Sequence, residues 1–102
     1  MANIDQIDSV VSPVLQKTNP PSMYNVIILN DEYTTADFVV YILQKIFSMD
    51  YERAEKLMFQ SHYEGQAVCG MYTLDIAETK IAQVFALSLQ NDHPLRCTME
   101  TV

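Results

Sequence analysis

The chain has 102 residues, enough for one domain with a single hydrophobic core. Hydrophobic residues make up 49% of it and charged residues 19%, which is typical of a folded globular domain and excludes a low-complexity or fibrous chain. The formal net charge of -7 argues against a nucleic-acid partner, because phosphates would be repelled. The apolar runs are too short for a membrane-spanning helix. We therefore expect a cytoplasmic protein.

The chain is predicted to begin with a flexible amino-terminal arm over residues 1–22, followed by a core domain over residues 23–102. The arm is polar and acidic at first and ends in Asn19-Pro20-Pro21-Ser22, where consecutive prolines favour an extended backbone. Apolar residues recur within it at helical spacing, at Ile4, Ile7, Val11 and Val14. A helix that forms on a partner is therefore an alternative to a mobile tail.

The core domain is predicted to open with a strand and a helix. Residues 23–29 are apolar on both faces, which indicates a central or well-covered strand. Residues 30–33 follow as a loop. Thr34 with Asp37 three residues later resembles a capping box, so a helix should begin there. Its buried stripe recurs at one-turn spacing and consists of Phe38, Val39, Ile42, Leu43, Ile46 and Phe47.

A second helix and a second strand come next. Asp50 is a natural N-cap, and Gly65 is suited to end the helix in the left-handed conformation, which predicts a helix over 51–64. Residues 67–72 are predicted to form a strand, with Gly70 marking a bulge or a close backbone approach.

A third helix and a third strand complete the chain. Thr73 is a plausible N-cap for a helix that runs to about Asn91, with a core face of Ala77, Ile81, Val84, Phe85 and Leu89. Apolar and polar residues then alternate over 95–100, as in a half-exposed strand. The fold class is therefore α+β, a two-layer sandwich of a three-stranded antiparallel sheet and three helices in the order β-α-α-β-α-β.

The two cysteines, Cys69 and Cys97, both lie in strand-like runs. Without a second cysteine pair or metal-spaced histidines beside them, they are predicted to be small buried side chains. We expect no metal and no cofactor.

Three hydrogen-bond acceptors are candidates for a site that binds a cationic, partly apolar group. Asn30 and Asp31 directly follow the first strand, and His62 lies near the end of the second helix, four residues after Met58. An α-ammonium group has three donors and one positive charge, which an amide oxygen, a carboxylate and an unprotonated imidazole can accept.

Three alternatives remain open from the residues alone. Asn-Asp-Glu after a strand is ordinary turn chemistry, and a histidine near a helix end is often only solvated. A small metal- or acid/base-dependent amidohydrolase would use Asp31, Glu32 and His62, although no nucleophile motif or second histidine accompanies them. A module of the same fold that binds a chaperone, without amino-terminal recognition, is the third.

Short motifs that resemble one family occur in order from Pro20 to about Glu100. They are Pro20-Pro21-Ser22-Met23-Tyr24, Asn30-Asp31-Glu32-Tyr33-Thr34, Phe38-Val39, Met58, His62-Tyr63, Gly65, Cys69-Gly70, Ala77-Glu78-Thr79-Lys80, and His93-Pro94-Leu95 with Cys97-Thr98. Together they resemble the ClpS family of N-end rule adaptors. The resemblance implies a non-enzymatic adaptor that binds proteins with a free amino-terminal Leu, Phe, Tyr or Trp and delivers them to the ClpA unfoldase of the ClpAP protease.

The resemblance also implies roles for particular residues. Asn30, Asp31 and His62 match the family's α-amino contacts. The positions around its side-chain pocket are matched by Glu32, Thr34, Ala36, Val39, Met58, Ser61 and Leu95, and those of its docking patch for the ClpA amino-terminal domain by Asp75, Glu78, Thr79 and Lys80. Ala36 departs from the family, because many members have a methionine there that guards the pocket mouth, so branched first residues should be excluded less sharply.

Overall fold

The structure is a computed structural model that describes residues 20–102. Most of the predicted arm, residues 1–19, lies outside the described residues, so the division into arm and core stays a prediction. The described elements follow the predicted order: β2 (Met23–Leu29), α1 (Ala36–Phe47), α2 (Tyr51–Glu64), β3 (Gln66–Thr73), α3 (Leu74–Gln90) and β4 (Arg96–Thr101).

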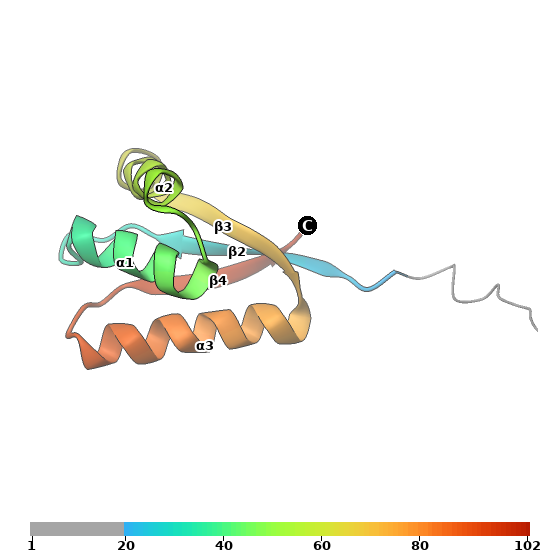
Figure 1. Cartoon of the computed structure of the whole chain (residues 1–102). Coiled ribbons are helices and arrows are strands. Elements are labelled where there is room, and N and C mark those ends of the chain that lie inside the picture. Colours follow the sequence, from blue (N-terminus) through green and yellow to red (C-terminus); the bar gives the residue numbers. More distant parts are fainter. Residues whose placement is uncertain (1–19) are drawn as a thin grey trace, which may run out of the picture.

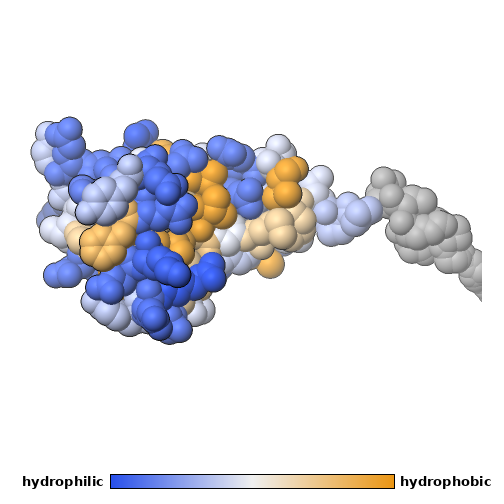
Figure 2. Space-filling model, turned by 90° about the horizontal axis from the view of Figure 1, so that it is seen from above, coloured by the Kyte–Doolittle hydropathy of each residue, from blue (hydrophilic) through white to orange (hydrophobic). Residues whose placement is uncertain are grey.

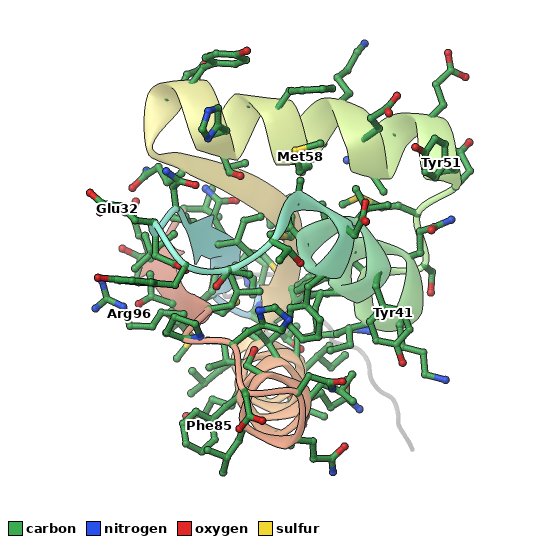
Figure 3. All side chains as sticks on the ribbon, turned by 90° about the vertical axis from the view of Figure 1, so that its left-hand side faces the viewer. Glu32, Tyr41, Tyr51, Met58, Phe85 and Arg96 are labelled. Atoms are coloured by element: carbon green, nitrogen blue, oxygen red, sulfur yellow. The ribbon has the colours of Figure 1, made fainter. Side chains whose placement is uncertain are left out.

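The strands form one antiparallel sheet in the order β3-β2-β4, which confirms the predicted fold class (Figure 1). β2 is central because both of its faces are apolar. Val26 and Ile28 belong to the main core with the helices, whereas Ile27 points to the opposite face and is only 2% exposed there. The three helices lie around one face of the sheet when it is viewed from its end (Figure 3). The sheet therefore supplies one wall of the core and the helices supply the other.

A bulge interrupts the pairing of β2 with β3, as Gly70 predicted. Val26 pairs with Gly70 and Ile27 with Val68, so Cys69 is the extra residue. A Cβ added at Gly70 would lie 2.6 Å from the Tyr72 hydroxyl oxygen. Glycine at this position lets the Tyr72 ring fold back against the strand.

Helix α1 begins one residue later than predicted. Thr35, not Thr34, is its N-cap, and the Thr35 side chain accepts a hydrogen bond from the Phe38 backbone N–H. The Thr34 hydroxyl instead donates to the Asp31 carboxylate within the preceding loop, so Thr34 belongs to that loop and not to the helix cap. The predicted stripe of six apolar residues on α1 is buried throughout, with Val40 in addition.

Helix α2 has the predicted bounds and caps. The Asp50 side chain accepts from the Arg53 backbone N–H at 2.8 Å, and Gly65 ends the helix at φ 92°. Seen from above, the surface over α2 is mostly hydrophilic, with hydrophobic side chains showing between the polar ones (Figure 2).

The predicted core face of α3 is partly wrong. Phe85 and Leu89 are 65% and 68% exposed, while Ala77, Val84 and Ser88 are the buried residues of this helix. Helix α3 packs against all three strands and against α1, and small side chains on that face allow a close approach. Ile81 and Leu87 are partly buried against the core, whereas Phe85 and Leu89 are left on the solvent side.

Both cysteines are free. Burial raises the pKa of the Cys69 thiol to about 12, and burial also raises the pKa of Cys97 to about 12. Both side chains are therefore uncharged at neutral pH.

None of the helices described within residues 20–102 combines the length and the hydrophobicity that a transmembrane span requires.

Candidate functional site

A cavity of about 480 Å³ lies between the loop after β2, the start of α1 and the last turns of α2. Its lining brings together nine of the ten residues predicted for amine and side-chain binding, which are Asn30, Asp31, Glu32, Thr34, Ala36, Val39, Met58, Ser61 and His62. In Figure 3, Glu32 on the loop and Met58 on the inner side of α2 lie on either side of this space. Segments about thirty residues apart in the chain thus share one hollow.

The loop that carries the acceptors is held by the Asp31 carboxylate. Its Oδ1 accepts from the backbone N–H groups of Tyr33 at 2.8 Å and Thr34 at 2.7 Å, and its Oδ2 accepts from the Thr34 hydroxyl at 2.7 Å. The carboxylate thus closes a tight turn directly after the strand. One lone pair of Oδ2 is left for a direct contact, and further contacts with a ligand would run through water.

The charge of Asp31 is retained in this turn. Partial burial acts to raise the pKa of Asp31, but the hydrogen bonds from Thr34 and Tyr33 and the nearby His93 outweigh it, so the pKa is lowered. The carboxylate is therefore ionised at neutral pH and supplies a negative charge to the cavity. Asn30 and His62 are exposed at the same cavity and add two uncharged acceptors when the imidazole is unprotonated.

The less exposed part of the cavity lining consists of Val39, Met58 and Ser61. Val39 is 8% exposed, Met58 is half-buried, and Ser61 is 3% exposed. The Ser61 hydroxyl donates to the Met58 backbone carbonyl at 2.8 Å, so its hydrogen atom is already used within α2. Ala36 is exposed at the start of α1. The cavity thus combines partly apolar lining with the polar side chains of Asn30, Asp31 and His62.

Leu95 is not among the residues that line this cavity, although it belongs to the same core cluster as Val39. It is 5% exposed and lines two other cavities, beside α3 and β4, of about 900 and 180 Å³. The larger cavity is also lined by Glu78 and by the exposed Phe85. Of the predicted pocket residues, Leu95 is thus the one that the structure does not bring to the cavity of Asn30, Asp31 and His62.

Two aromatic residues of the cavity lining were missed from the sequence. Phe59 and Tyr63 lie on α2 with ring centroids 6.3 Å apart, and they are 47% and 78% exposed. Tyr63 also meets His62 edge to face, with centroids 5.0 Å apart. Phe59 and Tyr63 directly follow Met58 and His62, and each pair is spaced by one helical turn. This spacing is the sequence signal that places the two aromatic residues beside the site.

The four residues of the predicted docking patch lie together at the start of α3. Asp75, Glu78 and Thr79 are exposed, and the Thr79 hydroxyl donates to the Asp75 backbone carbonyl at 2.9 Å. Lys80 is turned inward: its Nζ donates to the Ile46 backbone carbonyl at 2.7 Å, below the rings of Phe47 and Tyr72. Lys80 therefore ties α3 to the end of α1.

Within residues 20–102, no three His, Cys, Asp or Glu side chains are grouped so that they could hold a metal ion. Asp31, Glu32 and His62 line one cavity without forming such a group.

Comparison with known proteins adds an independent observation. The family model for "ATP-dependent Clp protease adaptor protein ClpS" matches residues 19–98. The ClpS adapter protein of Vibrio atlanticus is 56% identical over 84% of this chain and 81% of its own length. That of Salmonella gallinarum is 50% identical over 96% of this chain and 91% of its own length.

A solved structure is similar in fold as well as in sequence. Agrobacterium tumefaciens ClpS2, bound to L-phenylalaninamide, superposes with a TM-score of 0.79 and is 35% identical. The superposition covers 81% of this chain and all of that one.

Proposed function

Because the chain belongs to the ClpS family of adaptors of the ATP-dependent Clp protease, we propose that it binds proteins through a free, bulky hydrophobic amino-terminal residue and delivers them for degradation. The first residues in question are Leu, Phe, Tyr and Trp. The family assigns an adaptor and not an enzyme, so the amidohydrolase alternative is wrong.

One observation supports the proposal: a single cavity is lined by the acceptors Asn30, Asp31 and His62 and by a less exposed floor with two apolar side chains, Val39 and Met58. The three acceptors match the three donors of an α-ammonium group, and the Asp31 charge balances its positive charge. The floor of Val39, Met58 and Ser61 takes the first side chain. The flexible Met58 thioether suits it to several side-chain shapes.

The magnitudes explain why such a site would read a terminus and ignore internal residues. Burial of a Leu- or Phe-sized side chain contributes roughly 1.5–3 kcal/mol, and each hydrogen bond to a charged group about 1.5–3 kcal/mol. Association costs at least about 4 kcal/mol. The side chain alone does not offset this cost, and three hydrogen bonds at the lower end, about 4.5 kcal/mol together, exceed its lower bound by little. Tight binding therefore requires a ligand that presents both a free amine and a bulky side chain.

The ligand of the similar structure supports this assignment. L-Phenylalaninamide carries a free α-amino group and a benzyl side chain, and little else, and it is bound by A. tumefaciens ClpS2. This ligand supports the proposal that the cavity of the present chain takes the same two groups.

The delivery partner in this proposal is the amino-terminal domain of ClpA, the unfoldase of ClpAP, in the cytoplasm. Asp75, Glu78 and Thr79 offer an exposed polar surface at the start of α3. It is contiguous with the larger cavity beside β4 through Glu78. Residues 1–22 would form the arm through which cargo is transferred.

The test is a titration of the full chain with a Leu-initiated peptide and with its N-acetylated twin. Acetylation removes the charge that Asp31 balances, so we expect the affinity to fall by at least about tenfold. A chaperone-binding groove on the helices would not distinguish the two peptides. Equal affinity for both would refute the assignment of Asn30, Asp31 and His62 to the amine.

A further inference from the structure

A stacked aromatic pair stands exposed at the rim of the cavity, on α2. The Phe59 and Tyr63 rings are nearly parallel, 17° apart, with centroids 6.3 Å apart, and both line the cavity. We propose that Phe59 and Tyr63 form a second subsite, which binds the side chain of the substrate's second residue and selects aromatic or arginine side chains there. This inference rests on the proposed function.

The arrangement of α2 places the pair where a bound chain leaves the cavity. Met58, Ser61 and His62 share the inner face of the helix, and Phe59 and Tyr63 follow them by one residue, on the adjoining face. With the first side chain on the buried floor and the amine at His62, the second residue must point outward. Its Cα lies about 3.8 Å from the first, which keeps it beside the rim.

The chemistry of the rim selects the class of second residue. Flat aromatic faces stack with an aromatic ring or with a guanidinium group, which also gains a cation–π contact. The cavity lining carries the acidic Asp31 and Glu32, and none of its residues, which all lie within 30–63, is Lys or Arg. The local field therefore favours arginine and opposes an acidic second residue.

The experiment compares peptides that differ only at the second position. Four peptides beginning Leu-Phe, Leu-Arg, Leu-Ala and Leu-Asp, with a common remainder, are titrated into the full chain. We expect Leu-Phe and Leu-Arg to bind about threefold to tenfold more tightly than Leu-Ala, which is the range of aromatic and cation–π contacts, and Leu-Asp to bind more weakly than Leu-Ala.

The double variant Phe59→Ala/Tyr63→Ala should bind Leu-Phe, Leu-Arg and Leu-Ala with nearly equal affinity. Both rings are exposed, so the variant should still fold, which circular dichroism checks. Tyr51→Ala is the matched control: Tyr51 is also on α2, is 57% exposed and bonds to Glu55 away from the cavity. It should keep the wild-type preference. A double variant that retains this preference would overturn the subsite.

Failure of the subsite can be told apart from failure of the proposed function. Suppose that the wild type binds Leu-Ala, that acetylation of the peptide abolishes this binding, and that the affinity does not depend on the second residue. The subsite is then wrong, and the assignment of the amine site stands. If Leu-Ala and its acetylated form bind equally, the proposed function is wrong and the subsite falls with it.

Discussion

The backbone N–H of Asn30 donates to the carbonyl of Gly65 at 2.9 Å. This bond ties the loop after β2 to the turn between α2 and β3, next to the cavity that Asn30, Asp31 and His62 line together. Gly65 has φ 92°, a backbone conformation that residues other than glycine rarely adopt.

Replacing Gly65 tests this connection. An added Cβ would meet nothing within 4 Å, so the cost of Gly65→Ala is backbone strain alone, about 1 kcal/mol of unfolding free energy. Urea denaturation measures it, and the affinity for a Leu-initiated peptide should fall as well. Gly65→Asn is the control, because Asn tolerates the left-handed region and should lose less. Equal losses for Ala and Asn would mean that the conformation is not the cause.

The turn made by Asp31 should depend on pH in a defined direction. The pKa of Asp31 in the folded chain is lower than its ordinary value of 3.8. At a pH above the pKa of the unfolded chain, the ionised carboxylate therefore stabilises the fold. This stabilisation is lost as the pH falls through the pKa of the folded chain. Asp31→Asn should therefore be less stable than the wild type at pH 7. The difference should narrow below about pH 3.8. Urea denaturation at several pH values measures it, and a constant difference would contradict the turn's role.

Peptide binding should weaken on acidification from pH 8 to pH 5.5, because a protonated His62 no longer accepts a hydrogen bond from the amine. Asp31 contributes no change there, since its lowered pKa keeps it ionised. Titrations from pH 8 to pH 5.5 measure the effect, and His62→Ala should flatten the profile. His93 stacks on Phe38 with centroids 4.2 Å apart, outside the cavity lining, but it also lowers the pKa of Asp31. His93→Gln therefore measures how much of the profile acts through Asp31. A profile that persists in His62→Ala would exclude His62.

Ala36 should set the tolerance for branched first residues. Its methyl group leaves the cavity mouth open, and Ala36→Met would place a long side chain there. We expect the variant to discriminate Ile- and Val-initiated peptides from Leu at least about threefold more sharply than the wild type. Affinity for the Leu peptide is the internal reference. A variant that discriminates less sharply would show that the gate lies elsewhere.

The proposed docking patch predicts a contrast between Glu78 and Lys80. Glu78 is exposed, so Glu78→Lys should weaken binding to the ClpA amino-terminal domain with little effect on stability. Lys80→Met should lower stability by about 1 kcal/mol or more, because it leaves the Ile46 carbonyl without its donor. A pull-down and urea denaturation separate the two effects. Unchanged stability of Lys80→Met would contradict the structural role.

The sequence by itself determined the order of the elements, because local signals are strong there. Asp50 and Gly65 bound α2 as predicted, the apolar stripe of α1 is buried, and the bulge falls at Gly70. Caps, turn residues and hydrophobic periodicity act within a few residues of chain, so they are readable without the fold. The family motifs added the candidate site residues, nine of which share one cavity.

Only the tertiary structure decided which side chains are buried against one another and which are already engaged in hydrogen bonds within the chain. Thr34 looked like a cap, but its hydroxyl serves Asp31, and the Thr35 side chain caps α1. Phe85 and Leu89 fit a helical core stripe, yet they are exposed, and Ala77, Val84 and Ser88 are the buried residues of α3. Leu95 lines two cavities beside α3 and β4, and not the cavity that the acceptors line. Periodicity gives a face but not its rotation against a neighbour, since that rotation depends on how side-chain volumes from distant segments fit together.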